Sequence, residues 1–207
     1  GLNVGSVPPD VAGQAGRLTR LWAVVDSQRG RAVFGHGSFD IFSEAASQSN
    51  VWRAAPPGTT CNPRGLHPGA AMPARRFGSC AAYVYDQALG LGGVFVVGGQ
   101  PGGGRQAFKQ ALWLDLGAGG TWSDVTARFG NMDVFGTRYD AACAYNPATH
   151  QFYSWMGTAD PSIPDGAAQS GGVWRADLTP LGQADAPLTW ERLAKDNLAG
   201  FTGRSLV

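Results

Sequence analysis

The chain is poor in lysine and glutamate: its only lysines are Lys109 and Lys195, and its only glutamates are Glu44 and Glu191. These straight-chain residues are good helix formers, so their scarcity beside 31 glycines disfavours a helical fold. Hydrophobic residues make up 43% of the chain, which excludes wholesale disorder and allows a substantial core. The composition therefore favours short strands joined by turns.

An excess of charge is also missing. Sixteen Lys and Arg residues against fifteen Asp and Glu residues give a formal net charge of +1, which predicts no nucleic-acid partner. No apolar run is long enough to span a bilayer, so no membrane insertion is expected. The first residues, GLNVGSVPPDVAG, are not a signal peptide and are typical of the interior of a longer chain. Without an N-x-[ST] acceptor, a cytoplasmic or cytoskeletal location is favoured over a secreted one.

The three cysteines, Cys61, Cys80 and Cys143, are too few for a disulfide framework. None of them stands at C-x-x-C spacing, so no zinc site is predicted. Two interpretations remain open: a Cys61–Cys80 bridge in a secreted protein, or three free thiols in a reducing compartment, which we prefer. Cys80 and Cys143 are expected at equivalent points of successive strands, as small buried residues.

A tryptophan recurs at equal intervals along the chain. The segments VWRA, LWLDL and VWRADL contain Trp52, Trp113 and Trp174, and the interval from the first to the second equals that from the second to the third. Such a period indicates a repeat protein, so we expect these tryptophans to pack between repeat units in equivalent places. The same role is expected for Trp122 and Trp190, whereas Trp22 and Trp155 are assigned to the core.

Other features repeat at about the same interval as the tryptophans. Each unit opens with an arginine, followed by an apolar strand, a turn and a second strand. The arginines are Arg17, Arg76 and Arg138, the second strands lie at 31–37, 92–99 and 151–157, and closing strands begin at Thr121 and Thr189. In the first unit, no outer strand is found after residue 54.

Strands of five to nine residues at this period predict an all-β protein made of propeller blades, each with four antiparallel strands. The whole chain, 1–207, is expected to be one propeller segment. Its blades lie at about 17–75, 76–137 and 138–203, and 204–207 would begin a further blade.

The pattern VFVVGG followed by LWLDL and TW resembles the kelch repeat, whose propellers carry a double glycine after the second strand and spaced aromatic residues later. The middle unit matches best, the third has MGTAD in place of the double glycine, and the first has FGHG. The resemblance covers nearly the whole chain and implies a kelch-type β-propeller.

The glycine-rich stretch after Val97 also invites comparison with a phosphate-binding loop. A Walker loop requires lysine and then serine or threonine, but GGQPGGGRQ has Arg105 and Gln106 at those places. The stretch does not fit G-x-G-x-x-G either. We therefore interpret it as the end of a strand followed by a flexible loop.

Catalytic patterns are missing as well. His36, His67 and His150 are far apart and have no partner at metal-ligand spacing; His36 and His67 are assigned to loops and His150 to a hairpin turn. No nucleophile motif or carboxylate pair is found. The copper and iron sites of kelch enzymes cannot be assembled from these cysteines and histidines. The protein is therefore predicted not to be an enzyme and to need no cofactor or metal.

The loops between second and third strands, at 37–50, 100–110 and 158–170, are expected to emerge on one side and to bind a protein. The competing interpretation is that they are merely solvated. The proposed surface consists of Phe39, Asp40, Phe42, Arg105, Phe108, Lys109, Asp160, Ile163 and Asp165.

Three blades are fewer than the four to eight of known propellers, and an open propeller leaves two blade faces bare. The ranked explanations are a fragment of a longer chain, self-association, and a capping partner. The sequence thus predicts a non-catalytic interaction or structural scaffold within a larger chain or assembly. The alternative is a propeller enzyme or carbohydrate-binding module whose site lies partly outside this chain.

Overall fold

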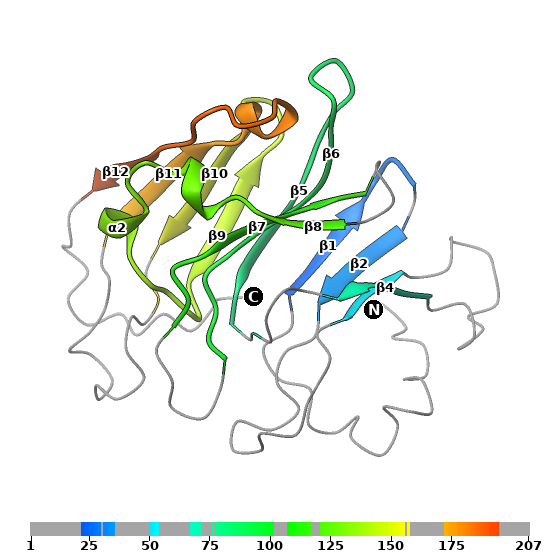
Figure 1. Cartoon of the computed structure of the whole chain (residues 1–207), viewed down its shortest axis with the longest axis horizontal. Helices are drawn as coiled ribbons and strands as arrows, with labels where there is room; N and C mark the ends of the chain where they lie inside the picture. The colour runs from blue at the N-terminus through cyan, green and yellow to red at the C-terminus, as the bar shows by residue number, and fades with distance from the viewer. Residues whose placement is uncertain are drawn as a thin grey trace.

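Strands dominate the protein. The structure, a computed structural model, describes residues 22–29, 31–35, 50–53, 67–71, 76, 78–101, 107–116, 121–155, 157 and 172–194. In this part the strands form three four-stranded sheets, each with its strands in chain order, and every neighbouring pair is antiparallel. Figure 1 shows the sheets side by side. The predicted all-β class with antiparallel sheets is confirmed.

The strands have the following bounds. The first sheet contains β1 (Trp22–Asp26), β2 (Arg31–Gly35), β3 (Asn50–Arg53) and β4 (His67–Ala71). The second contains β5 (Cys80–Asp86), β6 (Leu91–Val97), β7 (Ala111–Asp115) and β8 (Thr121–Asp124). The third contains β9 (Ala142–Asn146), β10 (Gln151–Trp155), β11 (Val173–Asp177) and β12 (Trp190–Ala194).

Short helical segments connect some of the strands. η3 (Thr126–Arg128) and α2 (Met132–Phe135) lie between β8 and β9, and η4 (Thr179–Gly182) lies between β11 and β12. Among the described residues, no helix has the length and apolar character needed to cross a membrane.

One expectation about the first sheet is wrong. The outer strand that could not be found after residue 54 is β4, and His67 begins this strand instead of lying in a loop. Its sequence, HPGAA, has neither β-branched nor aromatic residues, so strand propensity does not indicate it. Pairing with β3 supplies the hydrogen bonds that hold it in the sheet.

The first two strands of each sheet form a hairpin, here called the inner hairpin. These hairpins repeat more regularly than the tryptophans do. Their turns follow Asp26, Asp86 and Asn146, which stand at equal intervals and pair with Arg31, Leu91 and Gln151. Each turn has the same length, and the interval is one residue shorter than that of the tryptophans. The hairpins therefore give a common frame in which residues of the three sheets can be compared.

In this frame Trp113 is displaced by one residue. Trp52 pairs with Phe34 and Trp174 with Ser154, whereas the equivalent place in the second sheet belongs to Leu114, which pairs with Val94. A shift of one residue turns a side chain to the other face of its strand. The three tryptophans are therefore not equivalent. Trp113 and Trp174 instead enter the same buried cluster, from the second and third sheets respectively.

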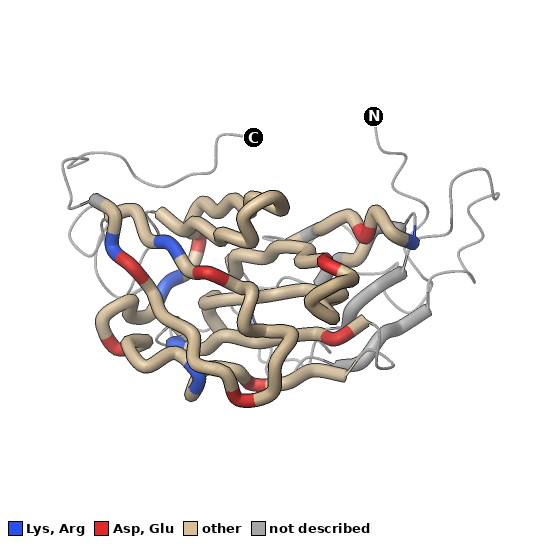
Figure 2. The backbone as a smooth tube through the Cα atoms, turned by 90° about the horizontal axis from the view of Figure 1, so that it is seen from above, with Lys and Arg blue, Asp and Glu red and all other residues tan. Residues whose placement is uncertain are grey.

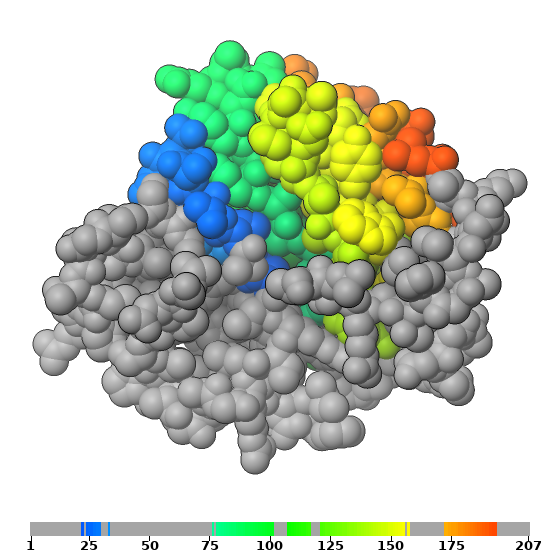
Figure 3. Space-filling model, turned by 180° about the vertical axis from the view of Figure 1, so that it is seen from behind, coloured from blue at the N-terminus to red at the C-terminus, as the bar shows by residue number. Residues whose placement is uncertain are grey.

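The sheets pack face to face. β1 contacts β5, β5 contacts β9, and β4 contacts β8, so these strands lie against their counterparts in the next sheet. Figure 3 shows the inner hairpins in chain order from blue through green to yellow. One apolar cluster lies between the first and second sheets and includes Trp22 and Val94. A larger one, between the second and third, includes Phe95 and Phe152.

Aromatic rings fill the larger cluster. The ring of Phe135, from α2, stacks on Trp190 with 3.9 Å between centroids and 8° between planes. Phe152 meets Phe95 edge-on at 5.2 Å. Such stacked and edge-on pairs add stabilisation beyond the burial of their area. Trp155 is half-buried and is not in either core cluster, contrary to the expectation for it.

Two of the repeated arginines are buried. Arg76 is 0% and Arg138 is 3% exposed. The Arg76 guanidinium donates to the Gly98 carbonyl oxygen at 3.0 Å and to the Gln110 side-chain oxygen. The Arg138 guanidinium donates to the Phe135 carbonyl oxygen at 2.8 Å. These arginines thus bind backbone carbonyls inside the protein, which explains why an arginine opens these units.

Candidate functional site

Most of the predicted loop surface lies outside the described part of the chain. This applies to Phe39, Asp40, Phe42, Arg105, Asp160, Ile163 and Asp165. His36 and Cys61 also lie outside it. Phe108 and Lys109 are described, and both are held by neighbouring residues of the scaffold.

Phe108 is half-buried against a core arginine. The Arg76 guanidinium lies 4.5 Å from the centroid of its ring, a distance typical of a cation–π contact. The Phe108 N–H donates to the Gly99 carbonyl oxygen at 2.7 Å. Lys109 forms an exposed ion pair with Asp133 of α2, and this lysine holds the pKa of Asp133 below its ordinary value. Both residues therefore fasten the end of the loop to the scaffold.

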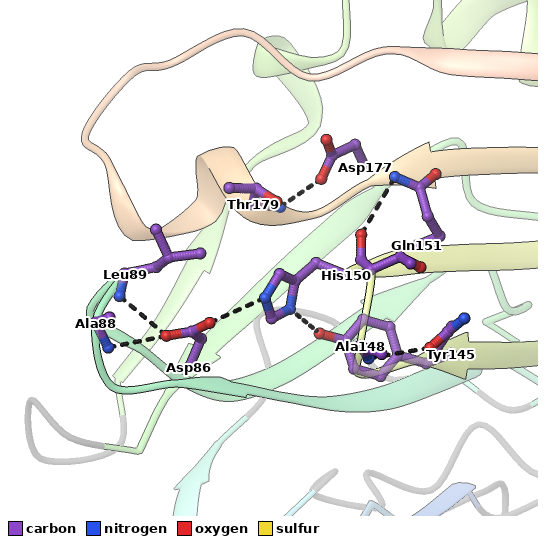
Figure 4. A network of polar contacts seen from close by, with 11 residues as sticks. Asp86, Ala88, Leu89, Tyr145, Ala148, His150, Gln151, Asp177 and Thr179 are labelled. Atoms are coloured by element: carbon purple, nitrogen blue, oxygen red, sulfur yellow. Dashed lines mark hydrogen bonds and ion pairs between the residues drawn. The ribbon is translucent and has the colours of Figure 1, made fainter.

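A connected polar site lies where the inner hairpins of the second and third sheets meet (Figure 4). Asp86 ends β5, and its Oδ1 accepts the N–H groups of Ala88 at 2.8 Å and Leu89 at 3.2 Å. An aspartate in this position closes a turn by replacing a backbone acceptor. Its other oxygen, Oδ2, lies 3.1 Å from Nε2 of His150.

His150 joins the two hairpins. It closes the turn before β10, as predicted, with a φ of 54°, and its side chain is 13% exposed. Its Nδ1 lies 2.8 Å from the Tyr145 hydroxyl. When that hydroxyl donates to Nδ1, the Nε2–H donates to Asp86. Both ring nitrogens are thereby engaged within the chain.

The environment of this site shifts two acid–base equilibria. Burial, followed by the nearby carboxylates of Asp86 and Asp177, raises the pKa of Tyr145 to about 12. The Leu89 N–H is the largest influence on Asp86, and together with the Ala88 N–H and His150 it holds the pKa of this carboxyl below its ordinary value. The phenol is therefore neutral and the carboxylate charged at neutral pH. This arrangement suits a fixed hydrogen-bonded tie between sheets, since a tyrosine nucleophile would need a lowered pKa.

A turn aspartate also lies where the first and second sheets meet. Asp26, 0% exposed, accepts the Arg29 N–H and the Arg29 guanidinium, each at 3.2 Å. Burial, followed by the neighbouring Asp26, raises the pKa of Tyr83 in β5. In both cases, the aspartate at the turn of one sheet lies beside a tyrosine of the next sheet. Of the two, Asp86 is the one joined to the next sheet by a hydrogen bond, through His150.

The sequence did not predict this site because its parts are local turns that meet only in the fold. Asp86 and His150 are 64 residues apart. The one available indication was that DQALG and NPATH follow strands at the same place in successive units. That spacing predicts neighbouring turns but does not define which side chains meet.

The preferred interpretation of Cys80 as a free, buried thiol is confirmed. The expected equivalence of Cys80 and Cys143 is wrong. Cys80 pairs with Val97, whereas Cys143 pairs with Ser154, so Cys143 is equivalent to Tyr83 and not to Cys80. Among the described residues, no three His, Cys, Asp or Glu side chains are grouped to hold a metal. Figure 2 shows the acidic and basic residues of this part interspersed along the chain.

Neither a family model nor a curated protein matches the chain.

The Asp86 contacts predict a stability change in acid. Because the folded pKa of Asp86 lies below its ordinary value of 3.8, the charged carboxylate stabilises the fold fully above about pH 5. This contribution is lost as the pH falls through the ordinary value and then through the folded pKa. Asp86→Asn should therefore melt below the wild type at about pH 6, and the gap should narrow at about pH 3.

Thermal melts of both proteins at the two pH values test this expectation. Asp177→Asn is the matched control, since Asp177 Oδ1 also accepts a turn N–H, from Thr179 at 2.9 Å, but forms no ion pair among the described residues. A gap of equal size at both pH values would show that the charge of Asp86 contributes nothing.

Proposed function

We propose that the protein is a non-catalytic scaffold for protein interaction or assembly, built as part of a kelch-type β-propeller. The proposal rests on three consecutive four-stranded antiparallel sheets in chain order. It is supported by the equal spacing of their inner hairpins and by the contacts of β1 with β5 and of β5 with β9. Successive sheets stacked on their faces are what propeller blades require.

A face of the third sheet carries this proposal. The corresponding face of the first two sheets is buried: Val33 is 2% exposed, Val84 0% and Phe95 0%. In the third sheet the equivalent places belong to Tyr153, Ala144 and Trp155, of which the two aromatic residues are half-buried and the alanine is exposed. The face that is buried in the first two sheets therefore carries accessible apolar side chains in the third sheet.

A further sheet of the same kind is the cover that best fits this face. It would repeat the packing of the first two interfaces, since the first strands of neighbouring sheets would again lie against each other. The sheet would come from the rest of a longer chain or from another copy. Arg175 and Glu191, paired at 2.5 Å across β11 and β12, give this face a polar margin. An apolar centre with a polar margin is typical of protein interfaces.

Trp155→Lys tests whether this face binds another copy. A lysine on the apolar face would have to lose its water on association, so we expect at least a tenfold weaker self-association. The measurement is the native mass over a range of concentrations, compared with the 21.6 kDa chain. The wild type should exceed that mass and the variant should approach it.

Val134→Lys is the matched control. Val134 is 67% exposed but belongs to α2, away from β10. This variant should associate like the wild type. A wild-type protein that stays monomeric, with both variants unchanged, would contradict self-association through the third sheet.

A further inference from the structure

Two thiols meet between the second and third sheets. Cys80 begins β5 and Cys143 lies in β9, the inner strands of their sheets. Cys80 belongs to the apolar cluster between these sheets, and Cys143 packs against it. Both cysteines are free thiols. The two side chains therefore face each other across the interface, although they are far apart in the chain.

The backbones are close together at this point. The Asp140 N–H donates to the Gly78 carbonyl oxygen at 2.8 Å, so the segments leading into β5 and β9 are within hydrogen-bonding distance. The sulfur of each cysteine contacts the segment that contains the other. Sγ of Cys80 lies 3.2 Å from the Ala141 carbonyl oxygen, and Sγ of Cys143 lies 4.0 Å from that of Ala81. Each sulfur thus lies close to the backbone of the segment that carries the other cysteine.

A buried hydroxyl completes the surroundings. Ser154 pairs with Cys143 across β9 and β10, and its side chain points into the same interface, with 1% exposure. Its Oγ makes no hydrogen bond in the structure, yet it lies close enough to lower the pKa of Cys80. A hydroxyl in this place can donate to a sulfur that gains negative charge.

The two thiols differ in reactivity. Burial, followed by the neighbouring Cys143, raises the pKa of Cys80. The hydrogen bond with Cys80 lowers the pKa of Cys143, against the effect of burial. Cys143 is also the more accessible of the two, since it is half-buried while Cys80 is 3% exposed. The thiolate is the nucleophile, so Cys143 is the cysteine that a small oxidant meets first.

We propose that Cys80 and Cys143 form a redox modification site, at which a small hydroperoxide converts the two thiols into a disulfide that joins the second and third sheets. The Cys143 thiolate attacks the O–O bond, which breaks; the sulfur becomes a sulfenic acid, and the other oxygen leaves as an alcohol, or as water from hydrogen peroxide. The sulfur of Cys80 then attacks that of Cys143. The S–O bond breaks, and the hydroxide leaves as water with the proton of Cys80. Two thiols are oxidised by two electrons in total, and one hydroperoxide is reduced.

The disulfide would stabilise the packing of the two sheets. It closes a loop that contains an entire sheet together with α2, which restricts the unfolded chain. For a chain of this size, the melting temperature should rise by roughly 5–15 °C. The oxidised protein would therefore hold its second and third sheets together under conditions that separate them in the reduced protein.

The test uses the Cys61→Ser chain, which keeps only the two cysteines of interest. After treatment with hydrogen peroxide and removal of the excess, the chain is unfolded, alkylated with N-ethylmaleimide and digested. We expect a monomer without alkylated cysteines, a mass lower by two hydrogens, and one linked pair of peptides containing Cys80 and Cys143. Reduction with dithiothreitol should restore both thiols and lower the melting temperature again.

Two variants in the same background separate the disulfide from other effects of the oxidant. Cys80→Ala and Cys143→Ala should each show no rise in melting temperature after peroxide, and melts in dithiothreitol establish that they fold. If a variant does not fold, the peptide map of the Cys61→Ser chain still decides. A Cys143 sulfinic acid beside an alkylatable Cys80, or a disulfide only between chains, would overturn the proposal.

Discussion

Gly98→Ala is expected to lower the free energy of unfolding by about 3 kcal/mol or more. Gly98 follows β6 with a φ of +70°, a conformation that costs an L side chain about 1–2 kcal/mol. A Cβ at this position would also collide with the Arg138 carbonyl oxygen. That oxygen cannot easily move away, because it accepts the Gly99 N–H at 2.6 Å. The strain adds to the cost of the backbone conformation.

Chemical or thermal unfolding measures the effect, which corresponds to a fall of roughly 6–12 °C in melting temperature. Gly92→Ala, in the strand that Gly98 follows, is the matched control. A Cβ at Gly92 would meet no atom within 4 Å, so this variant should stay within about 0.5 kcal/mol of the wild type. Equal stability of Gly98→Ala and Gly92→Ala would show that the backbone of residue 98 does not lie against Arg138.

The structure gives the double glycine a physical reason that the sequence could not supply. The sequence placed Gly98 and Gly99 at the end of a strand, and the structure has them directly after β6. The close approach of Arg138, which begins the next unit, is a contact between residues far apart in the chain. No local pattern predicts such a contact. In the third unit Gly157 lies one residue earlier in the hairpin frame than Gly98 does, with a φ of +97° and the backbone of Tyr139 and Ala141, of its own unit, nearby.

Alternation of apolar residues and turn residues was enough to predict most strands. β6 and β10 lie where the runs VFVV and QFYSW indicate them, and the turns before them contain glycine or asparagine–proline. The strand β4 was missed because its hydrogen bonds to β3, and not its own composition, define it. Propensity is a weak guide for such an outer strand.

Register was beyond the reach of the tryptophan spacing. If the units are aligned with an error of one residue, the two faces of a strand are exchanged. Aligning the units by their equally spaced tryptophans makes such an error at Trp113. The slightly shorter interval of the inner hairpins shows the correct frame. The cysteines illustrate the consequence: the correct frame removes their supposed equivalence and places them opposite each other, which is the basis of the proposed disulfide.

Arg76→Ala is expected to destabilise the protein by about 3 kcal/mol, through loss of hydrogen bonds and through an unfilled space. The Arg76 guanidinium donates to the Gly98 carbonyl oxygen and to Gln110, and its removal leaves these acceptors without that donor. It would also remove the partner of the Phe108 ring. Burial lowers the pKa of Arg76 to about 10, an effect that Asp124 only partly offsets. Keeping the guanidinium charged inside the protein therefore costs free energy.

The buried charge makes Arg76→Met the informative companion to Arg76→Ala. Methionine fills part of the space and removes the desolvated charge, but it cannot donate to Gly98. We expect it to lose less than the alanine variant and still to be less stable than the wild type, as measured by urea unfolding. Arg175→Ala is the matched control, because the exposed pair with Glu191 should contribute at most about 1 kcal/mol. If Arg76→Met is as stable as the wild type, the hydrogen bonds of the guanidinium add no net stability. The buried arginines at 76 and 138 would then serve to specify how each sheet joins the next, without adding stability.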